Sequence, residues 1–193
     1  GAFVLNGSSG VNSYVRVILP AWLDAFGDAR LEAGIKLSAP VDSSKWGAVM
    51  YRVQSGNYPY MQACIRYNAA VESGIEISQK NAANKWEVYQ NAASSAMVAG
   101  AYNHITVETQ CKSTDFSING NTVLHHSATP YSNGGWGFHV RGLTMAVDYV
   151  SLTFKENYTP FDLYTVSGHY ADVRDPATGI NIAPALITEV KTK

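Results

Sequence analysis

The sequence predicts an all-β protein built as a two-sheet antiparallel β-sandwich. Turn signals recur about every ten residues, and the short segments between them alternate apolar and polar side chains. No internal repeat of solenoid or propeller length is present. The chain has 193 residues, of which 46% are apolar and 15% charged. One globular domain, with a core large enough to need no disulfide, is therefore expected.

The clearest strand and turn signals begin at His104. Asn119-Gly120 predicts a two-residue type I′ hairpin, because both residue types tolerate positive φ. Phe116 and Ile118 alternate with polar residues before this turn, and Val123 resumes the alternation after it. These residues predict an antiparallel hairpin with one buried face.

A second turn, Asn133-Gly134-Gly135, precedes the last two predicted strands. The first strand should place Trp136, Phe138 and Val140 in the core, with His139 and Arg141 on the opposite face. The final strand carries four apolar residues, Val147, Val150, Leu152 and Phe154. We expect Val150 and Leu152 to pack against Trp136 and Phe138 between the two sheets.

Seven earlier segments are also predicted to be strands: residues 3–5, 14–19, 28–37, 46–53, 58–67, 71–79 and 85–90. Residues 20–27 are interpreted as a strand connection in which Trp22 and Phe26 pack over a sheet edge, with a helical turn as the alternative. Residues 92–102 are interpreted in the same way, as a connection in the sandwich or a weak helical turn.

The succession ITVE, ING, GGWGF and AVDYVSLTF resembles the closing half of concanavalin A-like lectin/glucanase domains. Within that superfamily it is most similar to laminin G-like and 3-keto-disaccharide-hydrolase-type jelly rolls. The resemblance is strong over residues 104–154, extends back to Ala29, and is absent beyond Glu156. It implies a jelly roll over residues 1–156, followed by a C-terminal extension over 157–193 that forms edge strands or begins a further domain.

Charge and composition exclude several classes of protein. A formal net charge of −1 gives no electrostatic footprint for nucleic acid or a membrane surface, and no apolar run is long enough for a transmembrane helix. The tyrosine- and glycine-rich, lightly charged composition favours an extracellular, cell-surface or periplasmic protein. Cys64 and Cys111 lie on different predicted strands and are expected to be two buried thiols, with a disulfide as the alternative.

Catalytic motifs are missing from the sequence. A family 16-type glucanase needs a Glu-x-Asp-x-x-Glu strand, which is absent, and Glu72 and Glu76 on one strand face would lie about 13 Å apart, too far for a catalytic pair. His125 and His126 are adjacent and should point to opposite faces, which is poor geometry for two ligands of one metal ion. No cofactor is expected, with calcium at Asp24, Asp28 or Asp42 as the alternative. Asp148 shares parity with Val150 and Leu152 and should therefore point inward, and the resemblance implies that it has a structural role.

The remaining candidate site is a polar and aromatic sheet face. The alternation predicts that Arg52, Gln62, Arg66, His139 and Arg141 point outward, and Trp86 supplies a flat aromatic surface. The resemblance implies that the concave outer face is the ligand groove, whereas the alternative is an ordinary solvated face. A one-residue change of register would reverse every one of these orientations.

Two functions follow from this reading. The first is a non-catalytic carbohydrate-binding or interaction module that binds an oligo- or polysaccharide and forms part of a larger secreted hydrolase, next to additional domains of the same polypeptide. The alternative is a glycoside hydrolase of the 3-keto-disaccharide-hydrolase type that acts on a saccharide in the concave groove.

Overall fold

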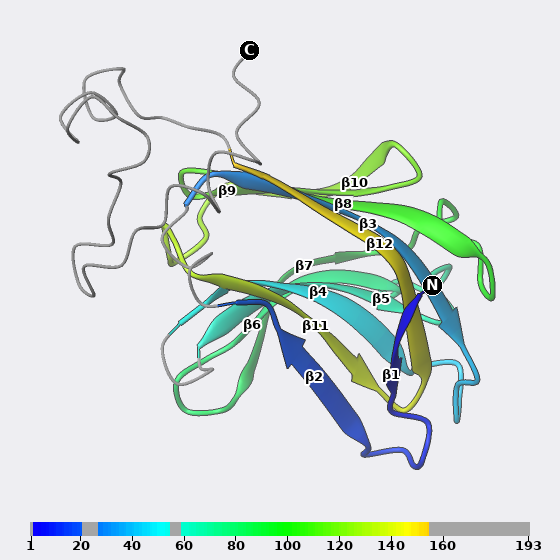
Figure 1. The fold of residues 1–193 in the computed structure, drawn as a ribbon. Helices are drawn as coiled ribbons and strands as arrows, with labels where there is room; N and C mark the ends of the chain where they lie inside the picture. Colours follow the sequence, from blue (N-terminus) through cyan, green and yellow to red (C-terminus); the bar gives the residue numbers. More distant parts are fainter. Residues whose placement is uncertain (1, 21–26, 55–58, 155–193) are drawn as a thin grey trace, which may run out of the picture. The chain divides into compact units, whose positions relative to one another are not determined.

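The structure is a computed structural model that describes residues 2–20, 27–54 and 59–154. Every regular element in these ranges is a β-strand, and the twelve strands form two six-stranded antiparallel sheets packed face to face (Figure 1). The predicted β-sandwich is therefore confirmed. No helix in these ranges could cross a membrane. The expected packing of residues 20–27 lies almost wholly outside the described residues, and the domain division at residue 156 stays a prediction.

We call the two sheets A and B. Sheet A has the order β1 (Phe3–Asn6), β12 (Thr144–Phe154), β3 (Ala29–Ser38), β8 (Tyr102–Gln110), β9 (Ser113–Ile118) and β10 (Asn121–His126). Sheet B has the order β2 (Tyr14–Ile18), β11 (Gly135–Arg141), β4 (Trp46–Val53), β5 (Tyr60–Arg66), β6 (Ile75–Lys80) and β7 (Trp86–Ala92). Strands far apart in sequence thus pair with one another, as a jelly roll requires.

The hairpin between β9 and β10 forms at the predicted turn. Asn119 and Gly120 have φ values of 52° and 81°, as the type I′ signal indicates. The Asn119 side chain fixes this turn further, because its Oδ1 accepts the backbone N–H of His104 at 2.8 Å and its Nδ2 donates to the Ala96 carbonyl at 2.7 Å. These hydrogen bonds therefore connect the turn to β8 and to the segment that precedes β8.

Alternation predicts the core correctly for β11 but not for the second half of β12. Trp136, Phe138 and Val140 are buried between the sheets, whereas Val150 is 39% exposed and Asp148 is also exposed. The burial expected for Val150 and Asp148 in the core is therefore wrong. The reason is that β1 pairs with β12 only as far as Val147, so the rest of β12 becomes an edge of sheet A.

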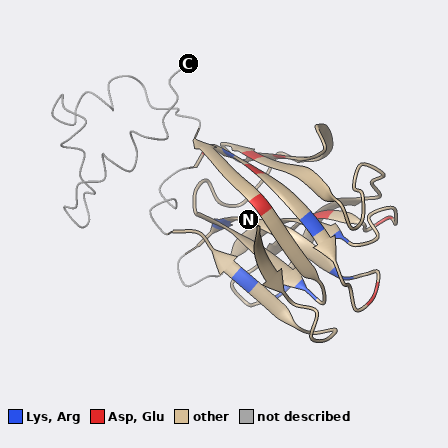
Figure 2. Cartoon of the chain, turned by 45° about the vertical axis from the view of Figure 1, so that its right-hand side comes forward, with Lys and Arg blue, Asp and Glu red and all other residues tan. Residues whose placement is uncertain are grey.

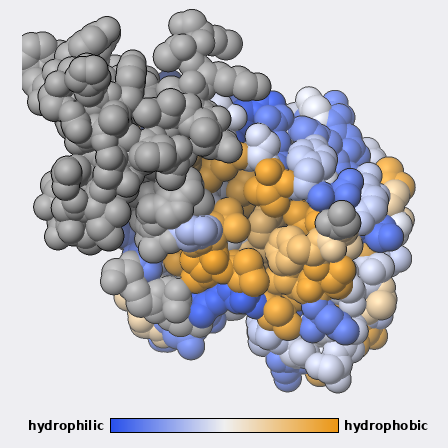
Figure 3. Space-filling view, in the orientation of Figure 1, coloured by the Kyte–Doolittle hydropathy of each residue, from blue (hydrophilic) through white to orange (hydrophobic). Residues whose placement is uncertain are grey.

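Apolar side chains gather on the side of the sandwich where the edge strands β1 and β2 lie (Figure 3). Phe3 and Val4 of β1 are 38% and 57% exposed there. Phe3 nevertheless closes the core at this edge, since its ring packs edge-on to Phe138 with centroids 5.8 Å apart.

Both cysteines are free thiols. Cys64 is buried on β5, as expected, but Cys111 is exposed in the tight turn between β8 and β9, where its φ is +51°. The expectation of two buried thiols is therefore wrong for Cys111, and the two cysteines belong to different sheets.

Candidate ligand groove

Strand register decides which side chains of sheet B face away from the core. A Cβ on Gly47 would lie 2.7 Å from the side chain of Leu37 of sheet A, so Gly47 faces the core and its neighbours Trp46 and Ala48 face outward. Arg141 pairs with Trp46 and His139 with Ala48, which places them on the same outer side. The groove face, as we call this outer face, contains Tyr14, Arg16, Ile18, Trp46, Ala48, Met50, Val53, Tyr60, Gln62, Cys64, Arg66, Glu76, Ser78, Lys80, Trp86, Val88, Gly137, His139 and Arg141.

Aromatic rings from distant strands meet on the groove face. The His139 ring lies 4.8 Å from Trp46 in an edge-on arrangement and 6.4 Å from Trp86 in a stacked one. Three strands separate β11 from β7, and neighbouring strands lie about 4.8 Å apart. A flat sheet would hold His139 and Trp86 well apart, so sheet B must be curved with this face on the concave side.

Most of this aromatic cluster is buried. Tyr60 and His139 are 1% and 5% exposed, and the Tyr60 hydroxyl lies 3.3 Å from Nδ1 of His139. Trp86 and Tyr14 cover them and remain 37% and 47% exposed. A ligand in the groove would therefore contact the rings of Trp86 and Tyr14, with Tyr60 and His139 forming the floor beneath.

Cationic side chains lie over three of the rings. The guanidinium of Arg16 is 5.7 Å from the Tyr60 ring centre, and that of Arg141 is 5.2 Å from Tyr14. Nζ of Lys80 is 4.6 Å from the centre of Trp86. Each separation falls within the range of a cation–π contact. Such contacts orient the cations over the groove without neutralising their charge.

His139 is held in its neutral form by this environment. Burial is the main reason that its pKa falls from 6.5 to about 3, and the positive charges of Arg16 and Lys80 lower it further. The ring therefore acts as a neutral hydrogen-bonding group in the groove floor at physiological pH.

Gln62 lies in the middle of the groove floor with an unused acceptor. Its side chain is 2% exposed and its Nε2 is 3.3 Å from the Ser78 hydroxyl, while its Oε1 has no hydrogen-bond partner among the described residues. A buried amide oxygen without a partner is costly. A hydroxyl of a ligand, or a water molecule beneath one, would satisfy it.

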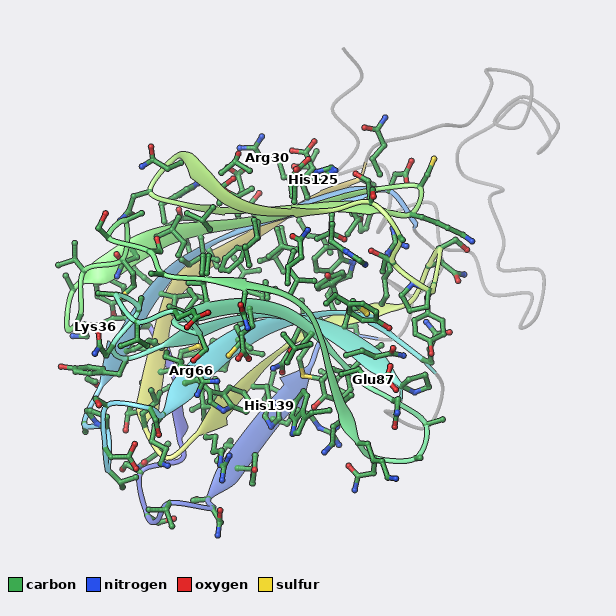
Figure 4. The ribbon with its side chains drawn as sticks, turned by 180° about the vertical axis from the view of Figure 1, so that it is seen from behind. Arg30, Lys36, Arg66, Glu87, His125 and His139 are labelled. Carbon is green, nitrogen blue, oxygen red and sulfur yellow. The ribbon has the colours of Figure 1, made fainter. Side chains whose placement is uncertain are left out.

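Arg66 and Arg141 lie at the end of the groove face and hold neighbouring loops. Arg66 donates to the Ser73 carbonyl at 2.6 Å and to Glu76 at 2.7 Å. Arg141 donates to the Val11 carbonyl at 3.2 Å and to the side chain of Asn12 at 2.9 Å. Both are on the predicted face (Figure 4 labels Arg66 beside His139), but these guanidinium groups already serve the protein's own loops.

The expected outward position of Arg52 is wrong. Arg52 is 1% exposed and donates from Nη2 to the carbonyl of Cys111, in the turn that follows β8 of sheet A. Its φ is +52°, and the register of β4 against β11 shifts between Gly137 and Gly135. This β-bulge inserts one residue, so Arg52 turns inward and Val53 turns onto the groove face, where it packs with Met50 and Tyr60.

Among the aromatic and cationic residues of the groove face, Tyr14, Arg16, Trp46 and Lys80 were not singled out from the sequence. Alternation within residues 14–19 does place Tyr14 and Arg16 on one side. Only the pairing of β2 with β11 brings them to His139, and a local pattern does not reveal a partner so distant in sequence. Lys80 was assigned to a loop, whereas it is the last residue of β6.

The groove face offers little for hydrolytic catalysis. Glu76 is the one carboxylate among its strand residues, and it forms an ion pair with Arg66. The prediction that Glu72 lies on the same strand as Glu76 is wrong, because Glu72 lies in the exposed turn before β6. His125 and His126 diverge as predicted: His125 contacts Asp115 on the outer side of sheet A, and His126 stacks on Tyr89. Across the described ranges, no three His, Cys, Asp or Glu side chains are grouped to hold a metal ion.

Solved structures with the same fold include a carbohydrate-binding module, a galectin and a candidate glycosyl hydrolase. The carbohydrate-binding module CBM66 from Bacillus subtilis superposes with a TM-score of 0.55 and 14% identity, over 75% of this chain and 83% of that one. Sheep galectin-11 gives 0.51 and 11%, over 75% and 99% of the two chains. A candidate glycosyl hydrolase from Parabacteroides distasonis gives 0.54 and 10%, over 80% and 81%.

No protein-family model and no curated protein sequence matches the chain. The structural likenesses, together with the two antiparallel six-stranded sheets, define the fold as a concanavalin A-like jelly roll. At these identities the likeness shows the fold alone, and one such fold supports many functions.

Proposed function

We propose that this domain is a non-catalytic carbohydrate-binding module whose ligand lies on the groove face. The observation that carries the proposal is the convergence of Trp86, Tyr14 and His139 from separate strands on one concave surface. Sugar rings present flat apolar faces edged with hydroxyls, and exposed aromatic rings beside hydrogen-bonding groups suit both features. Gln62 supplies one such group, with an acceptor that no described residue uses.

The similar structures support the same class of ligand. CBM66 is a carbohydrate-binding module by its own description, and the galectins share the fold as well. In this proposal the domain works within a larger secreted hydrolase, where it would hold the polypeptide on an oligo- or polysaccharide. Trp86 and Tyr14 would contact the sugar, and Lys80 and Arg141 would lie next to them.

The test is a glycan array followed by calorimetry of Trp86→Ala beside the parent. We expect Trp86→Ala to weaken binding at least about tenfold, or ~1.4 kcal/mol, since exposed aromatic anchors dominate such interfaces. Tyr102→Ala is the matched control, because Tyr102 is 47% exposed and also lies under a lysine, Lys36, but on sheet A. Equal losses in both variants, or no loss in either, would remove the groove face as the binding site.

A glycoside hydrolase is the second candidate, favoured by the fold shared with the Parabacteroides distasonis protein. The same glycans, incubated with the parent and analysed for released reducing ends, test it directly. Turnover that His139→Gln abolishes would contradict a non-catalytic module, because that result would place a proton-transfer group in the groove floor.

A further inference from the structure

We propose that the saccharide bound on the groove face carries an acetamido group, which Gln62 and Ser78 recognise through hydrogen bonds; this inference rests on the proposed function. Gln62 is 2% exposed, and its Oε1 has no hydrogen-bond partner among the described residues. A buried acceptor without a donor is costly. The bound ligand is therefore expected to bring an N–H or O–H group to this atom.

Strand register gives the immediate surroundings of Gln62. Met50 of β4 and Ser78 of β6 lie directly opposite it, and Cys64 follows it on the same side of β5. Side chains directly opposite each other on neighbouring strands have Cβ atoms about 5 Å apart. Met50, Cys64 and Ser78 are each at most 1% exposed. Gln62 thus lies in a buried, mostly apolar surface with one hydroxyl beside it.

These nearest neighbours of Gln62 are also uncharged. Figure 2 shows how few strand positions carry a charged residue, and Met50, Cys64 and Ser78 follow this pattern. Burial, and then the negative charge of Glu76, raise the pKa of the Cys64 thiol, so it keeps its proton. A ligand group placed here has to leave water without a partner of opposite charge, which favours a neutral group.

An acetamido group matches these surroundings in three ways. Its N–H can donate to Oε1 of Gln62. Its carbonyl oxygen can accept from the Ser78 hydroxyl, which lies 3.3 Å from Nε2 of Gln62 and can donate as well as accept. Its methyl group would bury apolar area against Met50 and Cys64. A ring hydroxyl could reach one of these polar groups, but it has no apolar part to bury.

The ring of Trp86 limits how such a group can enter. It lies 5.9 Å from the Trp46 ring and 6.2 Å from the Tyr60 ring, so it extends from β7 towards β4 and β5. Trp86 belongs to the edge strand of sheet B and is 37% exposed. An exposed side chain of this kind can change rotamer. A short substituent can then pass beneath the ring while the sugar remains against its face.

The experiment compares glycans that differ only in the substituent that replaces one hydroxyl of each sugar. Chitotetraose, its fully deacetylated form and cellotetraose share one backbone, and the methyl glycosides of N-acetylgalactosamine and galactose form a second pair. Calorimetry measures their binding to the parent. We expect the acetamido member of at least one pair to bind about tenfold more tightly than its hydroxyl counterpart. Deacetylated chitotetraose should bind more weakly than chitotetraose, because its ammonium groups would lose water.

Variants then locate the contact. Gln62→Met keeps the length of the side chain but removes the acceptor, so the preference for the acetamido member should fall about tenfold. Gln110→Met is the matched control, because Gln110 is exposed at the end of β8 on sheet A. The urea midpoint of unfolding verifies that each variant is folded.

The outcomes separate the two proposals. If both hydroxyl members bind as tightly as their acetamido counterparts and Trp86→Ala weakens both, the groove function stands and the acetamido inference is wrong. A preference that survives in Gln62→Met, or that Gln110→Met removes equally, also overturns it, as do array results in which the bound glycans carry no acetamido group. If no glycan of either pair, and none on the array, binds the parent, both proposals fail.

Discussion

The two outer faces of the sandwich use similar residues in opposite ways. On sheet A, charges are paired with one another: Arg30 lies 3.0 Å from Glu32 and 3.4 Å from Glu108, and His125 lies 2.7 Å from Asp115. On sheet B, the cations lie mainly over aromatic rings. Figure 4 shows residues of the two faces on opposite sides of the molecule, with Arg30 and His125 beyond one sheet and Arg66 and His139 beyond the other.

The difference indicates which face has capacity left for a ligand. The hollow on sheet A is lined by ion-paired groups and hydroxyls, namely Arg30, His104, Thr106, Glu108, Asp115, Ser117, Gly120 and Thr122. Exposed ion pairs contribute little to stability, and water satisfies them well. The groove face instead combines exposed rings, cations that lie over aromatic rings, and an acceptor of Gln62 that no described residue uses. Such groups gain more from a partner than from water.

The largest expected contrast comes from one glycine on each face. A Cβ on Gly137 would lie 2.3 Å from the backbone oxygen of Val17, so Gly137→Ala must displace β2 together with Tyr14 and Arg16. We expect a loss of about 3 kcal/mol in the free energy of unfolding. A Cβ on Gly34 of sheet A comes closest to the ring of Tyr149, at 2.8 Å, and this side chain can move, so Gly34→Ala should cost about 1 kcal/mol or less. Urea unfolding measures both, and equal losses would contradict the close approach of β2.

A smaller contrast should separate the ion pairs of the two faces. The side chains of Arg66 and Glu76 are 24% and 12% exposed, and Arg66→Ala leaves this carboxylate and the Ser73 carbonyl without a donor. The expected loss in the free energy of unfolding is about 2 kcal/mol. Arg30 is 42% exposed, so Arg30→Ala should cost about 0.5 kcal/mol. If the two variants unfold at the same urea concentration, the faces do not differ in how firmly they hold their charges.

A third contrast is a pH dependence that arises from the groove floor. Burial lowers the pKa of His139 from 6.5 to about 3, so between these values the unfolded chain binds a proton that the folded protein does not. Stability is therefore complete above about pH 6.5 and falls as the pH drops towards 3, by up to about 1.4 kcal/mol per pH unit. Urea unfolding of His139→Gln between about pH 7 and about pH 5 should show a flatter profile than the parent.

His126→Gln provides the comparison for this pH series. Burial also lowers the pKa of His126, at the border between β10 and β7, so its removal should flatten the profile too, but less than that of the more deeply buried His139. A parent whose stability does not change over this range would show that His139 is solvated in solution.

Sequence alone was sufficient where structure is decided locally. Asn119 and Gly120 specify their hairpin through backbone geometry, and the alternation around Trp136 specifies its burial. Both signals act within a few residues. The same alternation put His139, Arg141, Gln62 and Arg66 on one face, where the register of β4, β5 and β11 also places them.

The remainder depends on contacts between distant segments. No local pattern reveals that β1 stops pairing at Val147, which exposes Val150. None reveals that β2 borders β11, which brings Arg16 to Tyr60. The burial of His139 could not be predicted either, because Trp86, which contacts and covers it, comes from the distant strand β7.

The left-handed residue at Arg52 has a consequence for how the sheet could change by mutation. One inserted residue reverses the side of the sheet on which every later side chain of the strand lies. The bulge at Arg52 therefore decides which side chains at the end of β4 face the groove. With the ladder regular, Val53 would rejoin the core and a charged group would take its place beside Met50 and Tyr60. A glycine there would keep the backbone turn but lose the link from Arg52 to Cys111, whereas a lysine would keep the charge against an unfavourable φ. Neither Arg52→Gly nor Arg52→Lys is therefore a conservative replacement. The positive φ of Arg52 determines which side chains lie at this end of the groove face.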